Sequence, residues 1–74
     1  MRLTALKKGE KALIEKIESE GDLKTRLLSF GVTRGSEFQI ENCSLGRKTI
    51  EIIVDDTYIG LRLDEAHKIL VKRI

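Results

Sequence analysis

The first regular pattern along the chain is an apolar stripe with a helical period in residues 22–30. Leu23, Leu27 and Phe30 fall at positions i, i+4 and i+7, and Leu28 lies beside them. Side chains at this spacing share one face of an α-helix, so the pattern predicts one short amphipathic helix. We expect the leucines of this stripe, Leu28 included, to cover the core that the strands form.

The sequence also predicts where this helix begins and ends. Asp22 stands at the N-cap position, where its carboxylate can accept hydrogen bonds from the first unpaired amide groups. Gly31 stands at the C′ position, which favours a residue that tolerates the left-handed conformation. With Gly31 at C′, Val32 and Leu27 are placed for the apolar contact that closes a Schellman motif.

Most of the remaining chain alternates between apolar and polar residues, as half-buried strands do. The expected strands are 12–17, 37–43, 48–54, 57–63 and a last short strand in 70–74. The pair Asp55-Asp56 fits a two-residue hairpin turn, and Gly46 centres a loop over residues 44–47. Asp64 is expected to cap a single helical turn before the last strand.

These elements follow one another as strand, helix, three strands, helical turn and strand. Leu3 and Leu6 precede the first strand, and we expect them to anchor the N-terminal segment against the core. Short strands joined by tight turns in a chain of 74 residues favour a small barrel, because closure leaves no long exposed edge. The predicted fold class is mainly β: a single domain over residues 1–74, forming an SH3-like barrel of about five strands with one short α-helix after the first strand.

Composition narrows the class of protein. Hydrophobic residues make up 41% and charged residues 35%, which is ordinary for a small folded domain. The net charge of +2 neither requires nor excludes an anionic partner. Cys43 is the single cysteine, so an internal disulfide is excluded and a reducing compartment is favoured. With no bilayer-spanning run and no signal-peptide core, we expect a cytoplasmic protein.

Residues that could carry chemistry are few, and their spacing favours a binding module over an enzyme. His67 and Cys43 are distant in sequence, and nothing beside either marks a catalytic pair. A structural zinc site needs four such ligands, which excludes that class of site. Oxygen ligands at Asp55-Asp56, or at Asp64 with Glu65, could hold a divalent cation weakly. Turn and cap roles already account for those acidic residues, and we favour that interpretation.

Three groups of positions carry a family resemblance. An opening L-x-x-L-x-x-G pattern is formed by Leu3, Leu6 and Gly9, and an L-x-x-R-L-x-x-L-G…G pattern by residues 23–35, with Phe30 in place of a leucine. Further matches are Leu45-Gly46, Ile50-Glu51-Ile52, Ile59, Leu61, Arg62 and Ala66. In this order and at this spacing, the chain resembles the FeoA family of small cytosolic accessory proteins in bacterial ferrous-iron uptake.

The resemblance implies an SH3-like barrel with a helix after the first strand, in agreement with the pattern above. It also implies a role beside FeoB, a membrane transporter with a cytosolic GTP-binding domain, and no catalytic residues. We therefore expect a non-enzymatic module that requires no cofactor. It would dock on the cytosolic part of a FeoB-like transporter, at the inner face of the membrane, and modulate ferrous-iron uptake.

Four side chains are the candidate partner contacts: Lys24, Arg26, Tyr58 and Arg62. Arginine and tyrosine are the residues that most often anchor protein interfaces. Arg26 has an equal alternative, which is an ion pair with a neighbouring acidic residue. If Arg26 is a contact residue, Arg26→Ala should leave folding intact and weaken partner binding.

Two other functions stay open. Domains similar to FeoA end some iron- and manganese-responsive repressors, so a metal-binding regulatory domain is the second hypothesis. It would bind ferrous iron or another divalent transition metal weakly, through Asp55, Asp56 and His67. A nucleic-acid-binding small barrel is the third. We do not expect a nucleic-acid partner, because the basic residues are interleaved with acidic ones and only Tyr58 is placed for base stacking.

Overall fold

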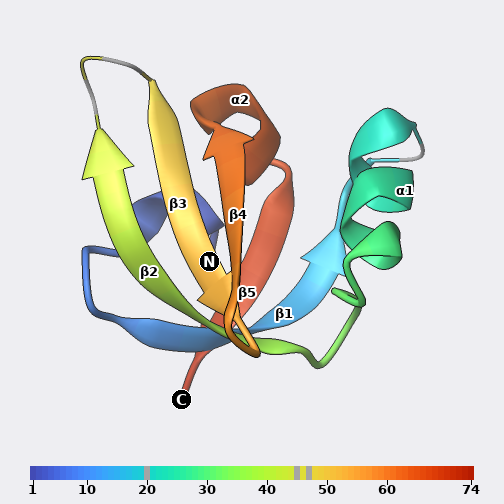
Figure 1. Cartoon of the computed structure of the whole chain (residues 1–74), viewed down its shortest axis with the longest axis horizontal. Helices are drawn as coiled ribbons and strands as arrows, with labels where there is room; N and C mark the ends of the chain where they lie inside the picture. The colour runs from blue at the N-terminus through green and yellow to red at the C-terminus, as the bar shows by residue number, and fades with distance from the viewer. Residues whose placement is uncertain (20, 45, 47) are drawn as a thin grey trace.

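The computed structural model describes residues 1–19, 21–44, 46 and 48–74. The elements shown in Figure 1 are, in chain order, η1 (Leu3–Ala5), β1 (Lys11–Ile17), α1 (Asp22–Ser29), β2 (Glu37–Ser44), β3 (Thr49–Val54), β4 (Thr57–Arg62), α2 (Leu63–Ala66) and β5 (Ile69–Arg73). This order agrees with the sequence prediction. In the loop predicted over residues 44–47, Leu45 and Arg47 lie outside the described residues, as does Glu20 before α1.

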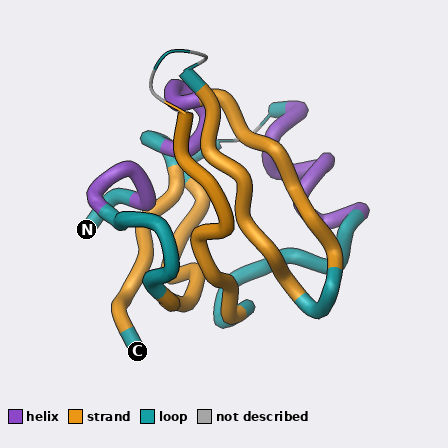
Figure 2. The backbone as a smooth tube through the Cα atoms, turned by 60° about the vertical axis from the view of Figure 1, so that its left-hand side comes forward, coloured by secondary structure: helices purple, strands orange, loops and turns teal. Residues whose placement is uncertain are grey.

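One antiparallel sheet, in the order β4-β3-β2-β1-β5, forms the body of the molecule. The sheet curls on itself into a small barrel, and α1 stands at one side of it (Figure 2). The prediction of a mainly β, SH3-like barrel with one short helix after the first strand is confirmed. Both chain ends lie away from α1 in Figure 2.

The core is aliphatic, because the inward positions of the alternating strands are almost all Ile, Leu or Val. Its largest fully buried side chains are Leu3, Ile14, Leu27, Ile40, Ile50, Ile52, Leu61, Ile69, Val32 and Val71. Leu3 and Leu6 are buried, so their role as anchors is confirmed. Each such side chain contributes about 1.5–3 kcal/mol by leaving water.

The hairpin between β3 and β4 turns at Asp55-Asp56, as predicted. Both residues have positive φ, 47° and 68°, and Val54 pairs directly with Thr57 across the turn. Two left-handed residues in a two-residue loop are the geometry of a type I′ turn, whose twist matches that of the strands. Aspartate tolerates this region better than most residues with a Cβ.

The C-terminal end of α1 is a Schellman motif, which confirms the prediction. Gly31 has φ of 80°, its N–H donates to Leu28 O at 2.9 Å, and the Val32 N–H donates to Leu27 O at 2.9 Å. The predicted N-cap was wrong. Gly21 is the N-cap residue and makes no side-chain cap bond, and Asp22 is the first helical residue, where a negative charge is favourable near the positive end of the helix dipole.

The predicted apolar stripe was only partly right. Leu23 and Leu27 are buried, but Leu28 is 62% exposed and Phe30 is 48% exposed. A helix of eight residues makes little more than two turns, so only one narrow side of it touches the barrel. The prediction that Leu28 belongs to the core is therefore wrong.

The predicted cap of the closing turn was also wrong by two positions. α2 begins at Leu63 with Arg62 as its N-cap residue, which leaves Asp64 inside the helix. Glu65 takes the capping role instead, because its Oε1 accepts the Arg62 backbone N–H at 3.0 Å.

Candidate functional site

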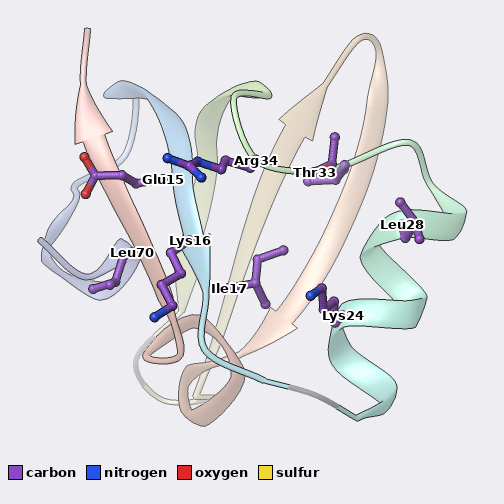
Figure 3. Close-up of a pocket in the computed structure, with 9 residues that line it drawn as sticks. Glu15, Lys16, Ile17, Lys24, Leu28, Thr33, Arg34 and Leu70 are labelled. Carbon is purple, nitrogen blue, oxygen red and sulfur yellow. The ribbon is translucent and has the colours of Figure 1, made fainter.

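A groove of about 610 Å³ opens between α1 and the strands β1 and β5 (Figure 3). Its walls come from three separate parts of the chain: the end of β1, the exposed side of α1 with the segment after it, and one residue of β5. The lining residues are Glu15, Lys16, Ile17, Lys24, Leu28, Val32, Thr33, Arg34 and Leu70. We take this groove as the candidate interaction site.

The groove exists because β1 loses β2 as a neighbour partway along its length, while it stays paired with β5. The register between β1 and β2 covers only Lys11 to Leu13, after which the Ile14 backbone bonds to Ser36 O and to the Gly35 N–H at 2.9 and 2.7 Å. From there on, the described ladder of β1 is with β5 alone, and α1 lies on the other side. The last residues of β1 therefore border a helix across a gap filled by side chains rather than a paired strand.

The most exposed apolar side chain that lines the groove is Leu28 of α1. This side chain is 62% exposed, which is unusual for a leucine beside the fully buried Leu27. Ile17 and Leu70 are half-buried and continue the apolar surface across the groove, and the buried Val32 also lines it. Grouped apolar side chains beside polar ones are a common feature of protein-interaction sites.

The charged part of the groove is mainly basic. Lys16, Lys24 and Arg34 line it against a single acidic residue, Glu15. Figure 3 shows Ile17 of β1 and Lys24 of α1 on facing sides of the groove. An apolar surface with this rim suits a partner segment that carries apolar and acidic side chains, because complementary charges steer and orient an encounter.

Arg26 points away from the groove. Its Nη2 lies 2.9 Å from Glu65 Oε1, so the ion pair that was one of the two predicted roles is present. Burial of Glu65 raises the pKa of its carboxyl group, but the hydrogen bonds from Arg26 and from the Arg62 backbone outweigh burial and hold the pKa below its usual value. A contact between Arg26 and a partner stays a prediction.

The four predicted contact residues do not form one surface. Lys24 lines the groove, while Arg26 turns toward α2. Tyr58 and Arg62 lie on the outer face of β4, and the Tyr58 residue is 58% exposed. Lys24 is therefore the predicted contact that the structure places in the candidate site.

The sequence prediction missed Leu28, Arg34 and the end of β1 as parts of a site. A helical wheel places Leu28 within 100° of Leu27, so periodicity alone assigns it to the core. The available signal was the length of the helix, because a helix of about two turns presents only one narrow side to the barrel. Nothing local to Lys16 or Arg34 distinguishes them from other solvated cations.

The proposed metal ligands are not brought together. Asp55 and Asp56 precede β4, and His67 follows α2 after the other end of the strand, so about 20 Å of strand separates them. Among residues 1–19, 21–44, 46 and 48–74, there is no cluster of three or more His, Cys, Asp or Glu side chains. Cys43 is half-buried against the core, as interpreted.

In the part of the chain that the structure describes, no helix is both long and apolar enough to cross a bilayer. The described helices of the barrel are short, and the longer of them, α1, has eight residues.

Comparison with known proteins identifies a matching protein family. Residues 1–73 match the model of the FeoA domain. A Campylobacter jejuni protein named Fe(2+) transport protein A is 39% identical over 74 residues, which cover all of both chains. A fusion of Fe(2+) transport protein A with the Fe(2+) transporter FeoB from Porphyromonas gingivalis is 31% identical, and this chain spans 9% of it. The solution structure of a Chlorobium tepidum FeoA protein superposes with a TM-score of 0.92 at 26% identity, over all of this chain and 70% of that one.

Proposed function

The chain belongs to the FeoA domain family, and from this premise we propose that it is a non-enzymatic accessory module of ferrous-iron uptake. In this proposal it docks on the cytosolic part of a FeoB-like transporter and modulates that transporter. The module would work in the cytoplasm and reach the inner face of the membrane through its partner.

The observation that carries the docking proposal is the exposure of Leu28 in a groove with a basic rim. A leucine that stays in water forgoes about 1.5–3 kcal/mol of burial, which a partner can recover on binding. Lys16, Lys24 and Arg34 around it favour a partner segment with acidic residues. Docking of this kind needs no reacting groups in the groove.

The Porphyromonas gingivalis fusion protein supports the choice of partner. That protein joins a relative of this chain to FeoB in one polypeptide. Covalent fusion raises the effective concentration of one part near the other, which is useful when the two act together. For a separate chain, the same association would have to come from a surface such as the groove.

The direct test is an NMR titration of the ¹⁵N-labelled chain with the cytosolic GTP-binding domain of its host's FeoB-like transporter. We expect shifts at Ile17, Lys24 and Leu28. Leu28→Asp should abolish these shifts, because it replaces an apolar contact with a carboxylate, in addition to the Glu15 carboxylate that already lines the groove. Phe30→Asp is the matched control, since Phe30 is also exposed near the end of α1 but does not line the groove.

No shifts at millimolar partner, or equal loss of binding in both variants, would contradict docking through the groove. Modulation has its own readout, which is the rate of GTP hydrolysis by the transporter with and without the chain. The wild-type chain should change this rate in either direction, and the Leu28→Asp variant should not.

A further inference from the structure

We propose that the groove binds an extended segment of the partner, which adds to the end of β1 as a short antiparallel strand and bonds to the Ile17 backbone. This inference rests on the proposed function, because it takes the groove as the docking site. It adds how the partner is held there and which residues the bound segment must contain. Apolar residues of that segment face the core side of the groove and alternate with acidic residues that face outward.

The backbone groups of Ile17 face the groove. The β1–β5 register pairs Lys16 with Leu70, and the Glu18 N–H donates to Lys68 O at 2.7 Å. Lys16 and Glu18 therefore point their backbone groups toward β5, and in an antiparallel ladder the residue between two such residues points to the opposite edge. The Ile17 N–H and C=O consequently point away from β5, to the side where α1 lies.

β1 has a strand along this edge only in its first part. The register with β2 ends at Leu13, and Ile14 then bonds to the backbone of Gly35 and Ser36. In the part of the chain that the structure describes, no ladder reaches this edge at Ile17. A strand edge with an available backbone donor and acceptor is the kind of surface that binds extended peptides by strand addition.

α1 lies beyond this edge, but it does not fill the space beside Ile17. The groove between them measures about 610 Å³, and Figure 3 shows Ile17 and Lys24 on its facing sides. Lys24 and Leu28 are one turn apart on α1, and both are exposed rather than packed against β1. At about 30 Å³ for each water, the groove has the volume of roughly twenty waters, which is room for a short extended segment.

The surroundings of Ile17 determine which side chains suit the bound segment. Ile17 packs against the core, and residues directly opposite in a sheet share a face. The partner residue opposite Ile17 therefore faces inward and should be apolar. Its two neighbours face outward, on the side of the exposed Lys16, because successive side chains of a strand alternate between faces.

The charges that line the groove favour acidic residues at those outward positions. Lys16, Lys24 and Arg34 line it, and Glu15 is the acidic residue among the described lining residues. No acidic side chain of the described residues forms an ion pair with any of these three cations. Carboxylates of the bound segment would therefore meet unpaired positive charge, which selects an acidic segment over a basic one.

A model peptide tests this mode of binding without the transporter. The probe is a capped hexapeptide of alternating aspartate and valine, titrated into the ¹⁵N-labelled chain. We expect NMR shifts at Ile17, Lys24 and Leu28, and about tenfold slower hydrogen exchange of the Ile17 amide at saturation. Glu18 is the internal control, because its N–H already donates to Lys68 O and its exchange should not change.

Methylated peptides separate backbone pairing from the other contacts. In the proposed register the valines point their N–H groups toward β1 and the aspartates point theirs away. N-methylation of the valines should therefore weaken binding at least about tenfold, whereas N-methylation of the aspartates should have little effect. A peptide of alternating lysine and valine, which reverses the charge and keeps the alternation, should not bind.

Variants of the chain test the role of the basic side chains. Arg34→Glu should weaken binding of the aspartate–valine peptide, because it replaces a positive charge of the groove with a negative one. Lys8→Glu is the matched control, since Lys8 is exposed and does not line the groove. Thermal unfolding checks that both variants fold.

The outcomes distinguish this inference from the proposed function. Strand addition is overturned if the aspartate–valine peptide fails to bind at millimolar concentration, or if methylation of its valines and of its aspartates has equal effects. Equal binding of the lysine–valine peptide also overturns it. If the GTP-binding domain still shifts Ile17 and Leu28 when the peptide fails, docking on the transporter stands without strand addition. If the peptide binds as expected and the domain does not, strand addition stands and the choice of partner is wrong.

Discussion

Arg26 Nη2 and Glu65 Oε1, which are 39 positions apart in sequence, lie 2.9 Å apart and tie helix α1 to the closing turn α2. The Glu65 side chain is 10% exposed, and the same oxygen also accepts the Arg62 backbone N–H. One carboxylate therefore joins the helix, the end of β4 and the turn that leads into β5. α1 is buried against the barrel through Leu23 and Leu27, and this ion pair adds a polar attachment to the closing turn.

Arg26→Ala should lower the free energy of unfolding by about 1–2 kcal/mol, because it leaves a mostly buried carboxylate without its charged partner. This replaces the sequence-based expectation that folding would be unaffected. Urea unfolding measures the change, and Lys24→Ala is the matched control on the same helix. In a double-mutant cycle with Glu65→Gln, additive effects would contradict a direct interaction.

Glu65 should also give a measurable pH dependence. Its pKa in the folded protein lies below the ordinary value of 4.5, so its stabilising effect is present above pH 4.5 and is lost as pH falls through the folded pKa. The difference in unfolding free energy between wild type and Glu65→Gln should therefore shrink as pH decreases below 4.5. Glu10 and Glu18 also have lowered pKa values and act in both proteins, so they cancel in the difference. A difference that grows at low pH would refute this role.

Replacement of two adjacent leucines by alanine should have very different effects on stability. Leu27→Ala removes a side chain with no exposed surface and should cost about 2–5 kcal/mol of stability. Leu28→Ala removes an exposed side chain and should change stability by less than about 0.5 kcal/mol. Thermal and chemical unfolding of the two variants settle the comparison, and similar losses would mean that Leu28 packs against the barrel in solution.

Substitution of Gly31 and of Gly60 by alanine gives a second matched comparison of stability. Gly31→Ala should destabilise the chain by about 1 kcal/mol, because Gly31 has φ of 80° and a Cβ is strained in that region. The space around both positions is open, so packing does not distinguish them. Gly60→Ala should be neutral or stabilising, since the Gly60 backbone is extended. Equal effects would count against the Schellman end as the cause.

Metal binding can be tested on the same chain by anaerobic calorimetry with ferrous iron. Because Asp55 and Asp56 precede β4 and His67 follows α2 beyond its other end, we expect any binding to be weak and unchanged in His67→Ala. Asp55→Asn tests the contribution of the turn carboxylates in the same titration. A stoichiometric event that disappears in His67→Ala would instead favour the metal-binding regulatory domain.

Some features follow from short stretches of sequence alone. The alternation around Asp55-Asp56 was enough to predict β3, the turn and β4, and Gly31 with Val32 was enough to predict the end of α1. These features depend on backbone sterics and on hydrogen bonds between residues close in sequence, which the local residue types largely decide. The ordered FeoA pattern was likewise readable along the chain.

Tertiary structure alone decided which leucine of α1 is buried, that Arg26 meets Glu65, and that β1 leaves β2 to make a groove beside the helix. Each depends on where the helix lies against the barrel, which is set by contacts between residues far apart in sequence. Periodicity gives the faces of a helix but not how much of each face the barrel can reach. Lys24 was therefore predicted as a contact, while Leu28, the exposed leucine of the groove, was assigned to the core.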